Sequence, residues 1–87
     1  MYSLEFRYSV EKTLQKLAKR NPKQLEIINK KIQEILQNPL SYKNLRAPMQ
    51  HLRLVHIDKS FVLVFSVYDE TKTVVIEDFD HHDKIYL

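Results

Sequence analysis

The spacing of hydrophobic residues changes twice along the chain, and each spacing predicts a different element. Residues 2–7 alternate between apolar and polar side chains, which predicts a short strand. From residue 10 the apolar residues recur every three to four positions, which predicts an amphipathic helix over residues 10–20. Ser9 is suited to cap that helix, and Glu11 is favourably placed in its first turn.

A second helix is predicted after the dipeptide Asn21-Pro22. Asparagine is a good N-cap and proline suits the first helical position, so the residues that end one helix also begin the next. Asn38-Pro39 ends the second helix. Its apolar stripe consists of Leu25, Ile28, Ile32, Ile35 and Leu36. Two amphipathic helices joined by a tight break form a hairpin whose apolar faces need a covering layer.

That layer is predicted to be a sheet. Residues 51–57, 61–67 and 72–79 are rich in β-branched and aromatic residues, and short polar turns separate them. The expected fold is therefore α+β, with the order strand, helix, helix, strand, strand, strand. The helix hairpin packs on one face of a largely antiparallel four-stranded sheet.

Composition narrows the function classes. A chain of 87 residues makes a single domain, residues 1–87, and it contains no cysteine and no glycine. Disulfides, thiolate metal sites and glycine-rich phosphate loops are therefore excluded. We expect a cytoplasmic protein without membrane association, because the sequence shows neither a signal peptide nor a membrane-spanning stretch. The net charge is +3, with lysines concentrated in the first half and acidic residues in the last part.

Three stretches resemble the RelE/ParE superfamily of toxins. The first is the helix end from Leu14 to Pro22. The second runs from Leu45-Arg46-Ala47-Pro48 through residues 51–57 and on to the apolar strand 61–67. The third is Asp80-His81-His82-Asp83-Lys84-Ile85-Tyr86, which is similar to the family's "H-x-x-x-I-Y" ending.

The resemblance implies the toxin of a type II toxin-antitoxin system. In the RNA-cutting branch such a toxin is an mRNA interferase, an endoribonuclease that cleaves mRNA on the ribosome without a metal or other cofactor. An mRNA 2′-hydroxyl attacks the neighbouring phosphate, so the reaction needs proton-transfer groups and cations. The partners would be a cognate RelB-like antitoxin, more acidic than this chain and joined to it in a hetero-oligomer, and mRNA on the ribosome.

The same resemblance nominates the site residues. His81 matches the family histidine and Tyr86 the near-terminal tyrosine, and Arg53 matches the strand arginine. Imidazole and phenol can transfer protons, and a guanidinium can hold a phosphate in a two-pronged grip. Each residue also has a purely structural interpretation. His81 would be a surface histidine, Tyr86 an aromatic side chain that packs the terminus, and Arg53 an exposed arginine.

Further candidates surround these three. His82 is a second possible catalytic imidazole. Lys43, Arg46 and Lys84 are candidate RNA-binding cations, although solvated surface charge would also explain them.

The sequence also departs from the RNA-cutting pattern. Val62 stands where many such relatives carry an arginine, and Asp78 or Asp80 stands where they often carry another. Each missing donor is commonly worth about 100-fold or more in rate. Three alternatives therefore stay open, namely a ParE-like toxin that binds DNA gyrase, a weak or inactive RelE homologue, and a binding module that only sequesters or autoregulates with its antitoxin.

A metal site is a further alternative. The acidic and histidine-rich segment Asp78 to Asp83 holds acceptable ligands for several divalent ions. Nothing elsewhere in the sequence supplies a clear additional ligand, so we expect no metal and no cofactor.

Overall fold

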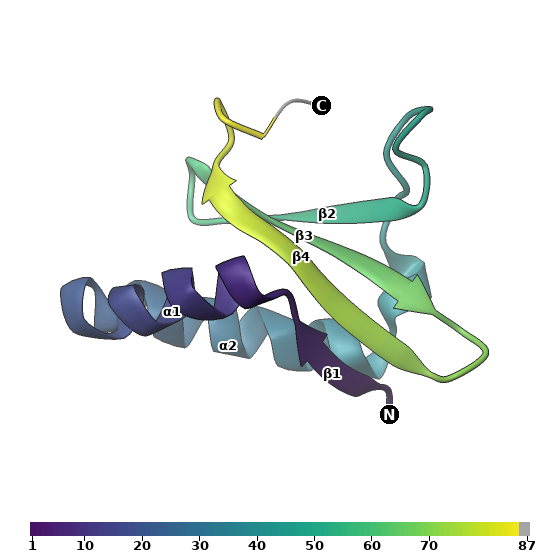
Figure 1. The fold of residues 1–87 in the computed structure, drawn as a ribbon, viewed down its shortest axis with the longest axis horizontal. Helices are drawn as coiled ribbons and strands as arrows, with labels where there is room; N and C mark the ends of the chain where they lie inside the picture. The colour runs from purple at the N-terminus through teal and green to yellow at the C-terminus, as the bar shows by residue number, and fades with distance from the viewer. Residues whose placement is uncertain (86–87) are drawn as a thin grey trace.

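The computed structural model describes residues 1–85, which form two layers (Figure 1). One layer is a four-stranded sheet and the other is a pair of helices. In chain order the elements are β1 (Ser3–Phe6), α1 (Tyr8–Arg20), α2 (Pro22–Gln37), the 3-10 helix η1 (Pro39–Ser41), β2 (Leu52–Ile57), β3 (Phe61–Tyr68) and β4 (Thr73–His81). This is the predicted element order and the predicted α+β class.

The sheet has the order β1-β4-β3-β2. Strands β2, β3 and β4 form an antiparallel meander, and β1 joins the outer side of β4 in parallel. The helix hairpin provides the long connection that brings the chain back from β1 to the far edge of the sheet. The sheet is therefore largely antiparallel, as predicted, with one parallel pair that the sequence did not reveal.

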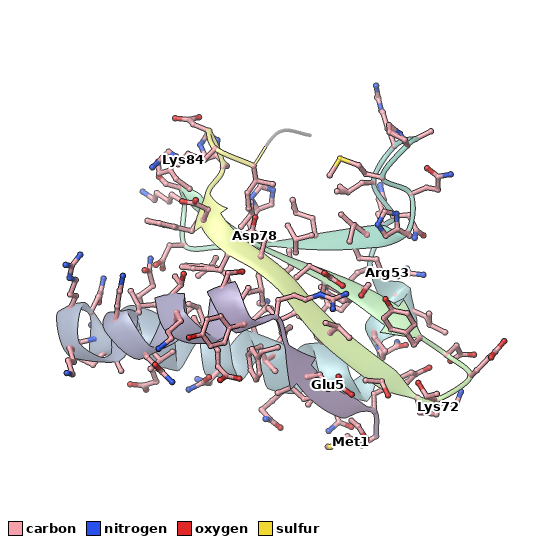
Figure 2. All side chains as sticks on the ribbon, in the orientation of Figure 1. Met1, Glu5, Arg53, Lys72, Asp78 and Lys84 are labelled. Carbon is pink, nitrogen blue, oxygen red and sulfur yellow. The ribbon has the colours of Figure 1, made fainter. Side chains whose placement is uncertain are left out.

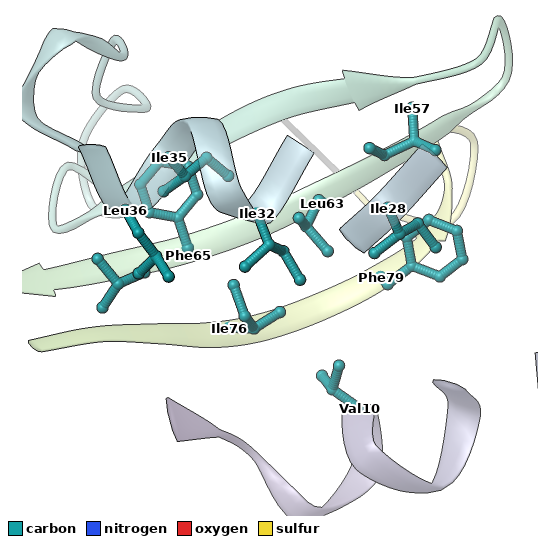
Figure 3. Packing of buried hydrophobic residues seen from close by; sticks show 11 residues of the cluster. Val10, Ile28, Ile32, Ile35, Leu36, Ile57, Leu63, Phe65, Ile76 and Phe79 are labelled. Carbon is teal, nitrogen blue, oxygen red and sulfur yellow. The ribbon is translucent and has the colours of Figure 1, made fainter. Parts of the chain in front are cut away.

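The hydrophobic core lies between the helices and one face of the sheet (Figure 3). Figure 3 shows side chains of α2 and of the two central strands packed against one another, with Val10 reaching in from α1. The fully buried members include Ile28, Ile32, Ile35, Ile57, Leu63, Phe65 and Ile76. Strand residues two apart share this face, because successive side chains of a strand point to opposite sides.

The helix ends confirm one predicted cap and correct another. Asn21 caps α2 through its side-chain oxygen, which accepts the backbone N–H of Gln24 at 3.1 Å. Ser9, in contrast, lies inside α1, which begins at Tyr8 after Arg7. The backbone N–H of Arg7 donates to the Ile76 carbonyl at 3.0 Å, so the end of β1 fixes the helix start earlier than the predicted cap.

The other face of the sheet carries no helix (Figure 1). Two segments rise on this open side, the loop between η1 and β2 and the tail after β4. The tail turns back so that Ile85, only 8% exposed, packs against Val62 and Val64. The part of the chain that the structure describes contains no helix long and apolar enough to cross a membrane.

Strand β4 extends beyond its parallel neighbour. β1 pairs with Thr73 to Ile76 only, so no described strand covers the outer edge of β4 after that point. There the backbone N–H of Phe79 donates to the Asp78 side chain at 2.8 Å, and the N–H of His81 donates to the Asp80 side chain at 2.7 Å. The two aspartates thus occupy donors that a further strand would use.

Candidate functional site at the end of strand β4

Two histidines lie side by side where β4 ends. The rings of His81 and His82 stack with centroids 4.8 Å apart. The carboxylate of Asp83 lies 3.4 Å from Nδ1 of His81 and 3.0 Å from Nδ1 of His82. The two imidazole side chains are 37% and 47% exposed, so a large ligand can reach both. A carboxylate that contacts an imidazole orients the ring, which suits proton transfer.

The sheet holds these histidines in place. His81 is the last residue of β4 and not part of a polar tail, and its ring packs edge-on against Phe61, with centroids 5.5 Å apart. Phe61 in turn stacks on Phe79 at 5.4 Å. The backbone N–H of His82 donates to the Ser60 carbonyl at 2.8 Å, which ties the tail to the turn between β2 and β3. Packing and backbone hydrogen bonds therefore fix where the pair sits.

Arg53 lies elsewhere. Because it alternates with Leu52 and Leu54, the sequence favours an orientation toward solvent or toward the site, and the structure corrects this. On β2 it shares the helix-covered side with Val55 and Ile57 and does not point to solvent. Its guanidinium donates to the backbone carbonyls of Leu40 and Tyr42. Alternation along the strand correctly predicted that Arg53 and the two leucines Leu52 and Leu54 point to opposite sides of the sheet. The side of Arg53 is the helix-covered one, because the carbonyls after α2 accept hydrogen bonds from its guanidinium.

Register shows that Arg53 and His81 are far apart. Arg53 pairs with Phe65 of β3, whereas His81 pairs with Phe61. Four residues of extended chain span about 13 Å. Figure 2 shows Arg53 near the start of β2 and Lys84 on the tail at the opposite end of the sheet. Arg53 therefore does not belong to the same cluster as the histidines.

The other predicted cations divide between the same two ends. Lys43 and Arg46 are exposed and lie in the loop between η1 and β2. That loop is held by hydrogen bonds of its own, such as Leu45 N–H to the Leu52 carbonyl at 2.9 Å. Lys84 is exposed and follows the histidine pair. Only Lys84 of these three is adjacent to the candidate proton-transfer groups, and Tyr86 lies outside the described residues.

The floor of the open face between the two ends is apolar and acidic. Val62 pairs with Asp80 across β3 and β4, and Val64 pairs with Asp78. Val62 and Val64 are buried, whereas Asp78 is exposed and Asp80 is half-buried. The positions where RNA-cutting relatives carry arginine thus lie together on one surface, and here they bear no positive charge.

A polar network lies at the middle of β4. Arg7 donates to Glu77 through Nε at 2.8 Å and Nη2 at 3.2 Å, and the Ser66 hydroxyl donates to Glu77 at 2.6 Å. Burial alone would raise the pKa of Glu77. The hydrogen bonds from Arg7 and Ser66 and the nearby positive charge outweigh burial, so the pKa is lowered from its ordinary value. Glu77 is therefore a structural anion that joins β4 to the start of α1.

Sequence reasoning missed two residues beside the histidines. Asp83 was considered only as a possible metal ligand, although its place directly after two histidines makes it the natural partner of both rings. Lys59 is exposed in the turn next to Ser60, whose carbonyl accepts the His82 N–H. The hydrogen bond between the tail and the β2–β3 turn brings the backbone of this lysine close to the histidine pair, and the sequence alone does not show it.

Comparison with known proteins identifies the family. Residues 4–86 match the model of the ParE toxin of the type II toxin-antitoxin system parDE. The chain belongs to the ParE toxin family. The resemblance to RelE/ParE toxins inferred from the sequence is thereby confirmed, and this toxin is a component of a type II toxin-antitoxin system.

Relatives of this toxin carry the names RelE, YoeB and ParE. A Methanocaldococcus jannaschii protein named "Putative toxin RelE4" is 58% identical over 86 residues, covering 99% of this chain and 92% of the relative. The toxin in the intact E. coli RelBE toxin-antitoxin complex is 26% identical, with a TM-score of 0.80 over 93% of this chain and 96% of that one. A YoeB/ParE toxin from Agrobacterium tumefaciens shares the fold at 15% identity, with a TM-score of 0.83 over 92% of this chain and 98% of that one.

Proposed function

We propose that this toxin cleaves mRNA on the ribosome, with the imidazoles of His81 and His82 as its proton-transfer groups. The supporting observation is the exposed pair of rings held by one carboxylate at the end of β4. Attack by a 2′-hydroxyl requires a base to take its proton and an acid to protonate the departing 5′-oxygen. Two neighbouring imidazoles can divide these tasks, and Asp83 orients both rings.

The cations for this reaction would come from the tail and the adjacent turn. Lys84 follows the histidines and Lys59 precedes Ser60, to which the tail is hydrogen-bonded. Both lysines are exposed and could contact the phosphate on which charge develops. Tyr86 stays a prediction as a stacking or proton-donating residue. The proposal assigns Arg53 a structural role, because its guanidinium is engaged by loop carbonyls at the other end of the sheet.

We further propose that a RelB-like antitoxin neutralises this toxin, because two relatives that are 26% identical, from E. coli and Mycobacterium tuberculosis, were crystallised as toxin-antitoxin complexes. An apolar surface suited to an antitoxin segment lies where β1 meets the helices. A hollow of about 310 Å³ between α1 and α2 is lined by residues that include Phe6, Leu14 and Leu25. A second hollow of about 270 Å³ lies between β1 and α2. An amphipathic helix would bury its apolar side there.

A toxin that does not cut RNA is the second candidate, and the open face of the sheet favours it. Asp78 and Asp80 repel phosphate, and Val62 and Val64 offer no donor. A gyrase-binding toxin or a weakly active RelE homologue would tolerate such a floor. The first candidate needs His81 and His82 for its activity and the second does not. Substitution of these histidines therefore distinguishes the two candidates.

The decisive experiment is ribosome-dependent cleavage in a purified translation system, with mapping of the 5′ ends of the mRNA. We expect cleavage by the wild-type toxin and losses of about 100-fold or more for His81→Ala and His82→Ala, at unchanged melting temperature. His56→Ala is the matched control, because His56 is an exposed histidine on β2 away from the pair.

Intact mRNA together with inhibited supercoiling by gyrase would establish the second candidate instead. Growth measurements complete the test. Expression of the toxin should inhibit growth, and co-expression of a cognate RelB-like antitoxin should relieve it. Unimpaired growth at verified expression of folded protein would contradict both candidates.

A further inference from the structure

The histidine pair has a second possible ligand besides RNA. We propose that His81, His82 and Asp83 bind a divalent transition-metal ion of the Zn²⁺ class, and that the bound ion inhibits the toxin. Metal binding itself is independent of the proposed function, whereas the inhibition rests on it.

The distances between the donor atoms are close to those of a tetrahedral site. Asp83 places one carboxylate oxygen 3.4 Å from Nδ1 of His81 and the other 3.0 Å from Nδ1 of His82. Bonds of about 2.0–2.2 Å to zinc place neighbouring tetrahedral donors about 3.3 Å apart. The three ligand atoms all lie within 4.8 Å of one another. The two rings are stacked at an interplanar angle of 29°, so the remaining adjustment is a rotation that aims both Nδ1 atoms at one ion. His82 and Asp83 are exposed, so their side chains are free to make it.

The hydrogen bond of His81 shows which nitrogen can bind the ion. The backbone N–H of Asp83 donates to Nδ1 of His81 at 3.3 Å, so this nitrogen carries a lone pair and no hydrogen. A metal ion on Nδ1 would replace that hydrogen bond, with the Asp83 carboxylate oxygen 3.4 Å away as a neighbouring ligand.

The ligand types select the class of ion. Two imidazoles and one carboxylate suit Zn²⁺ and its first-row neighbours, whereas Mg²⁺ prefers oxygen ligands alone. The sequence has no cysteine, so no thiolate competes for such an ion. Within residues 1–85 this is the only group of three histidine or acidic side chains whose donors lie so close together. Three protein ligands leave a fourth position for water.

Inhibition follows from the use of the ring nitrogens. A metal-bound imidazole carries its remaining hydrogen on the other nitrogen and does not take up a second proton. It therefore cannot act as the base that the proposed cleavage requires. The toxin with bound Zn²⁺ would therefore be inactive. Removal of the ion would make both imidazoles available for proton transfer again.

Binding is tested by titrating the full-length toxin with Zn²⁺ in competition with a chromophoric chelator, and by calorimetry. His81→Ala, His82→Ala and Asp83→Asn should each weaken binding about 10-fold or more, because each removes one of three ligands. His56→Ala should bind as the wild type does, and Mg²⁺ should not compete with Zn²⁺. Circular dichroism should show that all variants remain folded.

The possible results separate the two proposals. Absence of Zn²⁺ binding, or binding that the three variants leave unchanged, would overturn the metal site. Zn²⁺ binding without any loss of mRNA cleavage would overturn the inhibition. If the toxin binds Zn²⁺ at this site but cleaves no mRNA even after metal removal, the proposed function fails and the metal site stands.

Discussion

The two faces of the sheet differ in what their side chains have to achieve. The helix-covered face is filled with aliphatic and aromatic residues such as Ile32, Phe65 and Ile76, which are almost inaccessible to solvent. The open face places Val62 and Val64 beside Asp78 and Asp80, and only the returning tail covers part of it. Burial of apolar area stabilises the first face, whereas the second contributes less to folding and is available for binding.

The difference shows which residues can be changed without loss of the fold. Substitutions on the covered face create cavities that a small domain cannot absorb, because it has few other contacts to compensate. Substitutions at the exposed end of β4 remove chemistry and little packing. Stability and activity should therefore respond to different sets of variants.

The largest expected effect is on the covered face. Phe65→Ala removes a fully buried ring from the centre of β3 and should lower the free energy of unfolding by about 3–5 kcal/mol. Leu54→Ala, on the open face and half-buried, should cost less than half as much. Urea denaturation measures both, and equal losses would contradict the contrast between the faces.

Arg53 should behave as a structural residue. Arg53→Met keeps the aliphatic stem but removes the donors to the carbonyls of Leu40 and Tyr42, at a cost of about 1–2 kcal/mol. Its cleavage activity, measured well below the new melting temperature, should stay within a few-fold of the wild type. A 100-fold loss of cleavage at unchanged stability would instead return Arg53 to the catalytic set.

Glu77 should give a smaller and pH-dependent effect. Its pKa in the folded state is lowered below the ordinary value of 4.5, so its contribution is present above about pH 4.5 and is lost as the pH falls through the folded value. Glu77→Gln should cost about 1 kcal/mol at pH 7 and remove part of the acid sensitivity. Melting temperatures of both proteins between pH 3 and pH 7 measure this, and parallel curves would show that Glu77 contributes nothing to it.

The smallest expected effect is that of a chelator. Because the proposed cleavage uses side-chain imidazoles and cations, EDTA should leave the rate intact or raise it by removing inhibitory metal. The check is the rate of mRNA cleavage before and after dialysis against EDTA. Complete loss, restored by one divalent metal, would show that the reaction needs a bound ion and would contradict metal-independent cleavage.

The sequence predicted the elements well because their causes are local. Asn21 begins α2 through its side chain, and Asn38 ends it through its own backbone N–H. The last three strands are recognisable from their β-branched residues and the polar turns between them. The start of α1 was misplaced because a distant contact decides it. Arg7 is held by Ile76 and Glu77 of β4, about 70 positions away in the sequence.

The candidate site was predicted only in part for a similar reason. His81 and His82 are neighbours in the sequence, so their proximity needed no knowledge of the fold. The orientation of Arg53 depends on carbonyls after α2, and the position of Lys59 depends on the tail contacting Ser60. Alternation predicts that Arg53 and Leu54 point to opposite sides of the sheet. It does not predict which of the two sides the helices cover.

The outer edge of β4 has a consequence for how copies of this toxin behave toward one another. An uncovered strand edge is a template on which identical chains can add without end. Here the carboxylates of Asp78 and Asp80 already hold the outward N–H groups of Phe79 and His81. Two copies meeting edge to edge would also bring four negative charges together. The aspartates that weaken the attraction for phosphate thus also oppose the addition of a second copy at this edge.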